Sequence, residues 1–169
     1  MIRLLVSLCS VVAAVALAGC SHYQLGTGAK PTFRTLYIAP VTDTTMLPQA
    51  RALLSNQLRE TFARDGRVML VNSSEAADAS LDVTIQSFRR DVAAVREGDT
   101  GLARKFNLVL EAGCTLRARD GKTLFGNRPV RATREAFTDS GQLQAEYETL
   151  PLLTDALADR ILHAALDVW

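Results

Sequence analysis

The sequence predicts an α/β fold in which two helices pack on one face of a mixed sheet of about four strands, forming a two-layer sandwich. Three observations predict this fold. A helical pattern of apolar residues lies between two short apolar runs, long alternating segments fill the middle of the chain, and a second helical pattern closes it. Because each helix has one apolar stripe, both stripes must be buried against a sheet.

The N-terminus predicts a cleaved secretory signal. One charge, Arg3, precedes the apolar run 4–17 and the small residues Ala18 and Gly19. The apolar run is too short to span a bilayer stably. We therefore expect a signal peptide at residues 1–19, a lipid-anchored tether at 20–32, and one α/β domain at 33–169.

Leu17-Ala18-Gly19-Cys20 resembles the lipobox of bacterial lipoproteins. The resemblance implies that Cys20 is lipidated on its sulfur, cleaved free and acylated on its new amino group. Several acyl chains hold a protein on a membrane essentially permanently, whereas one chain binds marginally. Ser21 in the next position, rather than Asp, resembles the signal for export to the outer membrane. We expect the chain at the periplasmic face of a Gram-negative outer membrane.

The first structured segment is predicted to be a strand, a helix and a parallel strand. Residues 34–40 form a short strand ended by Pro40, and a polar loop leads to Pro48, which suits a first helical turn. Gly66 is placed to end the helix in a left-handed conformation, and residues 67–72 form the second strand. The apolar stripe of this helix is Ala50, Leu53, Leu54, Gln57, Leu58, Thr61 and Phe62.

Long strands and a last helix complete the predicted domain. Residues 79–96 and 104–120 alternate between apolar and polar positions, and Asp120-Gly121 turns into a third segment, 122–137. The pattern becomes helical again from about Gln144. Pro151 should kink this helix or mark its true start.

The net charge and the cysteines exclude several classes of protein. The formal charge of the whole chain is +1 and only 6% of the residues are aromatic, so the chain is neither a basic nucleic-acid binder nor an acidic disordered tail. Cys9 leaves with the signal and Cys20 carries lipid, so no intramolecular disulfide is expected. Cys114 lies in an alternating apolar set and is interpreted as a buried hydrophobic residue.

No catalytic or metal site is predicted, and no cofactor is expected. His22 lies in the tether and His163 on the last helix, and neither has a second His or Cys at metal-ligand spacing. A Gly-x-Ser-x-Gly nucleophile motif is absent from the sequence. The acidic residues Glu146 and Glu148 could be imagined as a glycosidase pair, but nothing marks a sugar cleft. We therefore do not expect an enzyme.

The order of these segments resembles the lipopolysaccharide-assembly lipoprotein family, LptE. The matching segments are Cys20, "HYQLG" close behind it, "TLYIAPV", the helix "QARALLSNQLRETFARDGRVMLV", "EAADASLDVTI", "VREGDTGLARKFNLVLEAGCTLR" and the last amphipathic helix. Members often have Gly directly after the lipidated Cys, where this chain has Ser21-His22. The resemblance implies that the protein plugs the lumen of the outer-membrane β-barrel LptD, helps the barrel assemble, and helps deliver lipopolysaccharide to the outer leaflet.

Cations near the turn between the two long strands are the candidate binding site. If these strands pair as a hairpin, the cations gather toward its tip and could contact the phosphates of lipopolysaccharide. Arg96 matches a basic position of the family at the end of this strand, while Asp91, Glu97 and Asp99 partly neutralise the region. The candidate contacts are Arg89, Arg90, Arg96, Arg104 and Lys105.

Two other functions remain open from the sequence. One is a periplasmic lipoprotein that activates a cell-wall synthase, and the other is a lipid carrier. An activator needs a long tether to reach the wall polymer, but residues 21–33 extend at most about 45 Å. A carrier needs a deep apolar cavity. The short tether favours a partner at the membrane.

Overall fold

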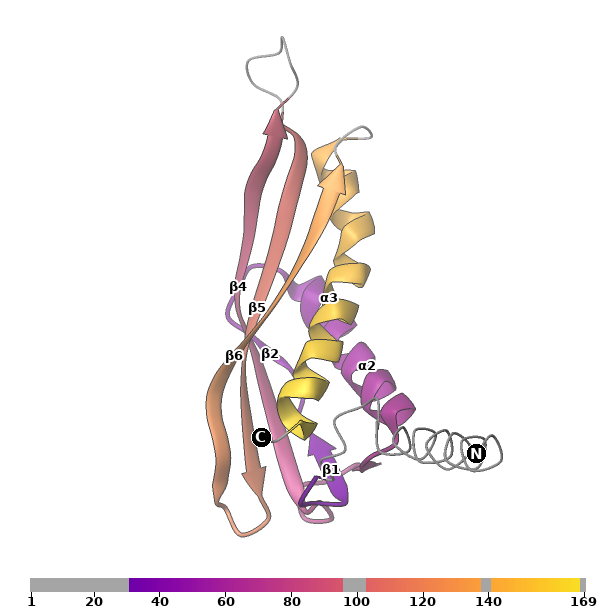
Figure 1. The fold of residues 1–169 in the computed structure, drawn as a ribbon, viewed down its shortest axis with the longest axis vertical. Helices are drawn as coiled ribbons and strands as arrows, with labels where there is room; N and C mark the ends of the chain where they lie inside the picture. The colour runs from indigo at the N-terminus through magenta and orange to yellow at the C-terminus, as the bar shows by residue number, and fades with distance from the viewer. Residues whose placement is uncertain (1–30, 96–102, 138–140, 168–169) are drawn as a thin grey trace, which may run out of the picture.

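A computed structural model gives the fold, and it describes residues 31–95, 103–137 and 141–167. Figure 1 shows a long, twisted sheet with both helices on one side of it. The helices and strands are β1 (Thr35–Ile38), β2 (Thr42–Asp43), α2 (Pro48–Asp65), β3 (Met69–Val71), β4 (Ala79–Val95), β5 (Ala103–Ala118), β6 (Thr123–Phe137) and α3 (Gln142–Leu166).

The predicted α/β fold with two helices and a mixed sheet is confirmed, but the predicted number of strands is wrong. The sheet has six strands in the order β3-β1-β4-β5-β6, with β2 also paired to β4. β1 pairs in parallel with both β3 and β4, and β2 pairs in parallel with β4. β4, β5 and β6 form an antiparallel meander. The sequence predicted a polar loop at β2, because a strand of only two residues is too short to show alternation.

The first strand, helix and strand follow the predicted pattern. α2 begins at Pro48, whose missing N–H costs nothing in a first turn, and ends at Gly66, which has a φ of 72°. The amide of Gly66 donates a hydrogen bond to the carbonyl of Phe62. β1 and β3, on either side of α2, pair in parallel as predicted.

β4 and β5 form a long hairpin whose pairing shifts at a bulge in the middle of β4 and again near the end of β4. The pairing of β4 with β5 has an irregularity between Ile85 and Ser87. This β-bulge adds one residue, so Ile85 and Phe88 point to the same face although they are three residues apart. Between this bulge and Val92, the even-numbered residues of β4 therefore point to the side of the helices.

α3 is one continuous helix that passes through Pro151. Residue 151 is therefore not its start, which corrects one of the two predicted readings. The carbonyl of Pro151 accepts hydrogen bonds from Thr154 Oγ1 of the same helix and from Gln57 Nε2 of α2. At the other end of the helices, Arg67 contacts Asp167 Oδ1 at 2.6 Å and so ties the end of α2 to the end of α3.

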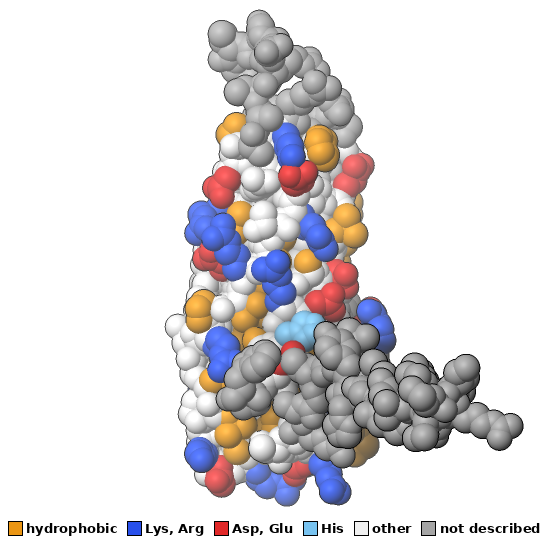
Figure 2. Space-filling model, in the orientation of Figure 1, with side chains coloured by type: hydrophobic (Ala, Val, Ile, Leu, Met, Phe, Trp, Pro, Cys, Tyr) orange, Lys and Arg blue, Asp and Glu red, His pale blue; other side chains and the backbone are white. Residues whose placement is uncertain are grey.

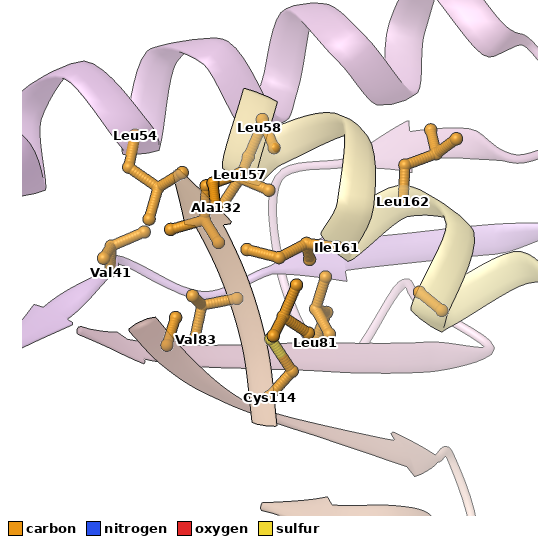
Figure 3. Close-up of a cluster of buried hydrophobic side chains, with 14 of the residues drawn as sticks. Val41, Leu54, Leu58, Leu81, Val83, Cys114, Ala132, Leu157, Ile161 and Leu162 are labelled. Carbon is orange, nitrogen blue, oxygen red and sulfur yellow. The ribbon is translucent and has the colours of Figure 1, made fainter. Parts of the chain in front are cut away.

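The apolar core lies between the sheet and the two helices. Figure 3 shows Leu54 and Leu58 of α2 and Leu157 and Ile161 of α3 beside residues of β4, β5 and β6. Cys114 belongs to this core and is completely buried, as predicted. Its burial raises the pKa of the thiol to about 12. The remaining labelled core residues in Figure 3 are Val41, Leu81, Val83, Ala132 and Leu162.

Helix coverage of the sheet is uneven along the molecule. α2 packs against α3, β2 and β3, whereas α3 runs along β6 and β5 toward the turn between β4 and β5 (Figure 1). The helix-side residues of β4 are buried up to Ile85, but Arg90 and Val92 are exposed. We call the less covered part the distal half, and it comprises residues 88–92 of β4, 105–108 of β5, 134–137 of β6 and 142–150 of α3.

Candidate functional site

The cations predicted to gather at the hairpin do not form one cluster in the described residues. Arg89 and Arg90 are neighbours on β4, and successive strand residues point to opposite faces. Arg89 contacts Glu111 Oε1 at 3.1 Å on the face away from the helices. Arg90 points to the helices and contacts Glu146 Oε1 of α3 at 2.5 Å.

The other three predicted cations are only partly described. Lys105 lies on β5, and its Nζ is 2.5 Å from Glu135 Oε1 of β6. The Lys105 ammonium also lies 5.6 Å from the centre of the Phe137 ring. Arg96 and the side chain of Arg104 lie outside the described residues. Each described cation of the set therefore has a carboxylate partner.

A groove lies beside the first turn of α2, at the edge of the part of the sheet that α2 covers. It has a volume of about 260 Å³ and lies between β4, the start of α2 and the first turns of α3. Its lining is mainly apolar. The lining residues are Leu47, Gln49, Phe88, Arg90, Leu143, Glu146, Tyr147 and Leu150.

One ion pair supplies most of the charge in this groove. Arg90 binds Glu146 through two nitrogens, since Nη2 also lies 2.8 Å from Glu146 Oε2. Gln142 Nε2 donates to the same carboxylate, and the Arg90 guanidinium lies 5.3 Å from the centre of the Phe88 ring. The pair is neutral overall. A guanidinium has five N–H donors, however, and those that do not bind Glu146 can donate to a ligand.

Large apolar side chains are exposed around the groove. Leu143 is 83% exposed and Tyr147 68%, and Met46, next to the lining residue Leu47, is 98% exposed. Contiguous exposed apolar residues commonly mark binding surfaces for proteins or lipids. This site was not predicted from the sequence, although Leu143 and Tyr147 lie off the buried stripe of α3 and could have indicated it.

The face of the sheet away from the helices is polar and carries paired charges. Glu111 of β5 lies between Arg89 of β4 and Arg131 of β6, at 3.1 and 3.6 Å. Arg117 and Asp82 form a further cross-strand ion pair. Such opposite-charge pairs stabilise neighbouring strands modestly and leave a hydrophilic surface.

The remaining candidate residues from the sequence, His163 and Glu148, have partners on their own helix or directly after it. His163 Nδ1 lies 2.8 Å from Asp167 Oδ2, and Glu148 accepts a hydrogen bond from Gln144. Residues 31–95, 103–137 and 141–167 contain no group of three or more His, Cys, Asp or Glu that could hold a metal ion. Within the same ranges, no helix is both long enough and apolar enough to cross a membrane.

The fold and the family comparison define the class of this protein. Residues 33–165 match a family model described as "LptE: Lipopolysaccharide-assembly". The protein is therefore of the lipopolysaccharide-assembly class. It belongs to the LptE family, as the sequence predicted.

Solved structures of several lipoproteins share the fold. An uncharacterized lipoprotein B from Nitrosomonas europaea is 21% identical, with a TM-score of 0.54 over 85% of this chain and 90% of that one. A minor lipoprotein from Acinetobacter baumannii is 16% identical, with a TM-score of 0.52 over 80% and 92% of the two chains. The rare lipoprotein B from Shewanella oneidensis is 16% identical, with a TM-score of 0.51 over 78% and 92%. No curated protein matches the chain significantly.

Proposed function

We propose that this protein is anchored by lipid on Cys20 at the periplasmic face of the outer membrane, where it plugs the β-barrel LptD. In this position it helps the barrel assemble and helps deliver lipopolysaccharide to the outer leaflet. Family membership is the observation that carries the proposal, because barrel and lipopolysaccharide are the partners of the LptE family. The protein acts through binding rather than through a reaction.

The dimensions of the fold support a plug. β4 has 17 residues and is therefore about 55 Å long. The apolar band of an outer-membrane barrel is about 25 Å tall, so a domain of this length can fill a lumen from end to end. The lumen of such a barrel is polar. The paired charges on the outer sheet face suit contact with a polar wall.

The distal half supports contact with lipopolysaccharide. Arg90 lies beside an apolar groove, and this combination suits a molecule that carries both phosphates and acyl chains. Arg89 and Lys105 lie on the same half of the sheet but away from the groove. We propose that Arg90 makes the central phosphate contact, together with Arg96, Arg104 and, at the edge of the surface, Arg89 and Lys105.

The partner is tested by purifying the lipidated protein from its own outer membrane in a mild detergent. Mass spectrometry then identifies what accompanies it. A large barrel in roughly equal amount is the expected result. Recovery of a cell-wall synthase without a barrel would overturn the proposal in favour of the activator, and lipid without any protein would favour the carrier.

The lipid contact is tested with a cation variant and a matched control. Arg90→Ser combined with Arg96→Ser should weaken lipopolysaccharide binding to the lipidated protein at least about tenfold, because two charge-assisted contacts are lost. The control is Arg117→Ser with Arg119→Ser, which removes the same charge at the far end of the sheet. Equal binding by both variants would remove the distal cations from consideration.

A further inference from the structure

Three arginines along the seam between β6 and α3 donate hydrogen bonds to backbone carbonyls across that seam. Arg134 Nε donates to the carbonyl of Leu152 at 3.4 Å, and Arg128 Nη1 donates to the carbonyl of Ala164 at 2.7 Å. Arg160 of α3 donates in the opposite direction, to the carbonyl of Arg131 at 2.7 Å. We call Arg128, Arg134 and Arg160 the basic seam.

The positive charge of the basic seam is not compensated locally. All three side chains belong to exposed residues, and the acceptors of these hydrogen bonds are neutral backbone carbonyls. Within the described ranges, no carboxylate lies within 4.0 Å of any of them, whereas Arg89, Arg117 and Arg131 on the outer face each contact one. Asp159 lies next to Arg160 in the sequence but is not paired with it. Figure 2 shows blue side chains on this side of the molecule, with red ones among them.

The hydrogen bonds to carbonyls hold these guanidinium groups at fixed positions. The β6 residues at which the three contacts occur are 128, 131 and 134, so the contacts are spaced about 10 Å apart along the strand. Arg128 is held further by the Phe125 ring, whose centre lies 4.2 Å from the guanidinium carbon. A guanidinium that is already ordered loses less conformational entropy when a ligand binds.

We propose that the basic seam is the surface through which this protein contacts carboxylates on the inner wall of its barrel partner. The inference rests on the proposed function and adds the seam between β6 and α3 to the outer sheet face as a second contact with the wall. Charge complementarity is the argument for this occupant. The remaining N–H donors of each arginine form a planar fork that matches the carboxylates of Asp and Glu side chains, and the inner wall of an outer-membrane barrel is polar.

The test compares a seam variant with a charge-matched control. The full lipidated chain is expressed in its own host as wild type, as Arg128→Gln/Arg134→Gln/Arg160→Gln, and as Arg51→Gln/Arg59→Gln/Arg64→Gln on α2. All three arginines of the control also lack a carboxylate within 4.0 Å in the described ranges. Each protein is captured from the outer membrane in mild detergent and washed at increasing salt. The barrel and lipopolysaccharide that remain bound are then quantified.

The amount of barrel that stays bound to the seam variant should be lower than that bound to the wild type by a factor of at least about five. The amount bound to the control should lie within about twofold of the wild-type amount. Equal retention by the seam variant, or equal loss by the control, would overturn the proposal. Loss of lipopolysaccharide with the barrel retained would assign the seam to lipid phosphates instead. Absence of a barrel with the wild type would contradict the proposed function itself and the seam proposal with it.

A conservative variant guards against misfolding. Arg128→Lys/Arg134→Lys/Arg160→Lys keeps the charge but removes the planar forks. It should retain an intermediate amount of barrel and lose it at lower salt than the wild type. Retention that matches the wild type at every salt concentration would contradict a role for guanidinium geometry, and retention as low as that of the Gln variant would contradict a role for charge.

Discussion

Neighbouring residues of a strand can serve different surfaces of this protein. Arg89 and Arg90 are adjacent, yet Arg89 joins the charge pairs of the outer face and Arg90 joins the groove beside α3. The bulge after Ile85 decides which of them points to the helices. At the scale of single residues, the face of the sheet to which a side chain points therefore determines its contacts more than its position along the chain does.

Gly113 gives a prediction at this scale. A Cβ at this position would overlap Gln86 Nε2 and Asn127 Oδ1, which form a 2.8 Å hydrogen bond across the central strand. Gly113→Ala should lower the free energy of unfolding by about 1 kcal/mol, because this bond must open. Urea unfolding checks the value. Gly126→Ala is the control, since the nearest atom is 3.6 Å from its Cβ position, and a loss as large as that of Gly113→Ala would contradict the explanation.

Cys114 gives a second prediction. Because burial raises its pKa to about 12, the folded thiol stays protonated at pH 8 to 9. The unfolded thiol ionises near pH 8.5, so the unfolded chain loses this proton first and stability falls as the pH rises from about 8.5 toward 12. The unfolding free energy of the wild type minus that of Cys114→Ala, measured across this range, should fall steadily as the pH rises. A constant difference would refute the assignment.

At the scale of helices and strands, burial along α3 separates structural positions from surface positions. Leu157 is completely buried, whereas Leu152 of the same helix is 60% exposed. Leu157→Ala should cost about 2–5 kcal/mol of stability, since it leaves a cavity in the core. Leu152→Ala should change stability by less than about 0.5 kcal/mol. Thermal or urea unfolding measures both, and similar losses would show that α3 does not pack as described.

Asp78 links two strands and gives a pH prediction. Its carboxylate accepts hydrogen bonds from the amides of Arg34 and Thr35, and these bonds lower its pKa. A lowered pKa in the folded state adds stability above the unfolded pKa of about 3.9, and that stability is lost as the pH falls below it. Asp78→Asn should therefore unfold with a weaker dependence on pH between about 5 and 2. An unchanged acid transition would contradict this role.

At the scale of the whole molecule, the proposed anchor determines where the domain can act. Cys20→Ser removes the sulfur that would be lipidated. This variant should not incorporate labelled palmitate and should keep its signal peptide, so it should migrate more slowly on a gel than the mature wild type. Incorporation of palmitate by the variant would show that Cys20 is not the acylated residue.

Local patterns explain which parts of the fold could be predicted. Short stretches of sequence contain the patterns that predict α2, its ends at Pro48 and Gly66, and the meander of β4, β5 and β6. β2 leaves no mark, because two residues cannot show a period. The position and shape of the groove could not be predicted, because they depend on how far α3 extends beyond α2 along the sheet, although Leu143 and Tyr147 could have indicated an exposed apolar surface. The cation cluster was predicted from the hairpin pairing of the two long strands, but Arg89 and Arg90 do not join one cluster because successive strand residues point to opposite faces.

The uneven helix coverage of the sheet has a consequence for backbone amide exchange. The end of the sheet covered by both helices should open only when the whole chain unfolds, so its amides should exchange slowly with deuterium. Amides of β4 from Phe88 to Val92 have fewer buried neighbours and should exchange through smaller, local openings. The molecule would then have a slowly exchanging end and a rapidly exchanging end, and a bound partner on the distal half would reveal itself as slowed exchange there.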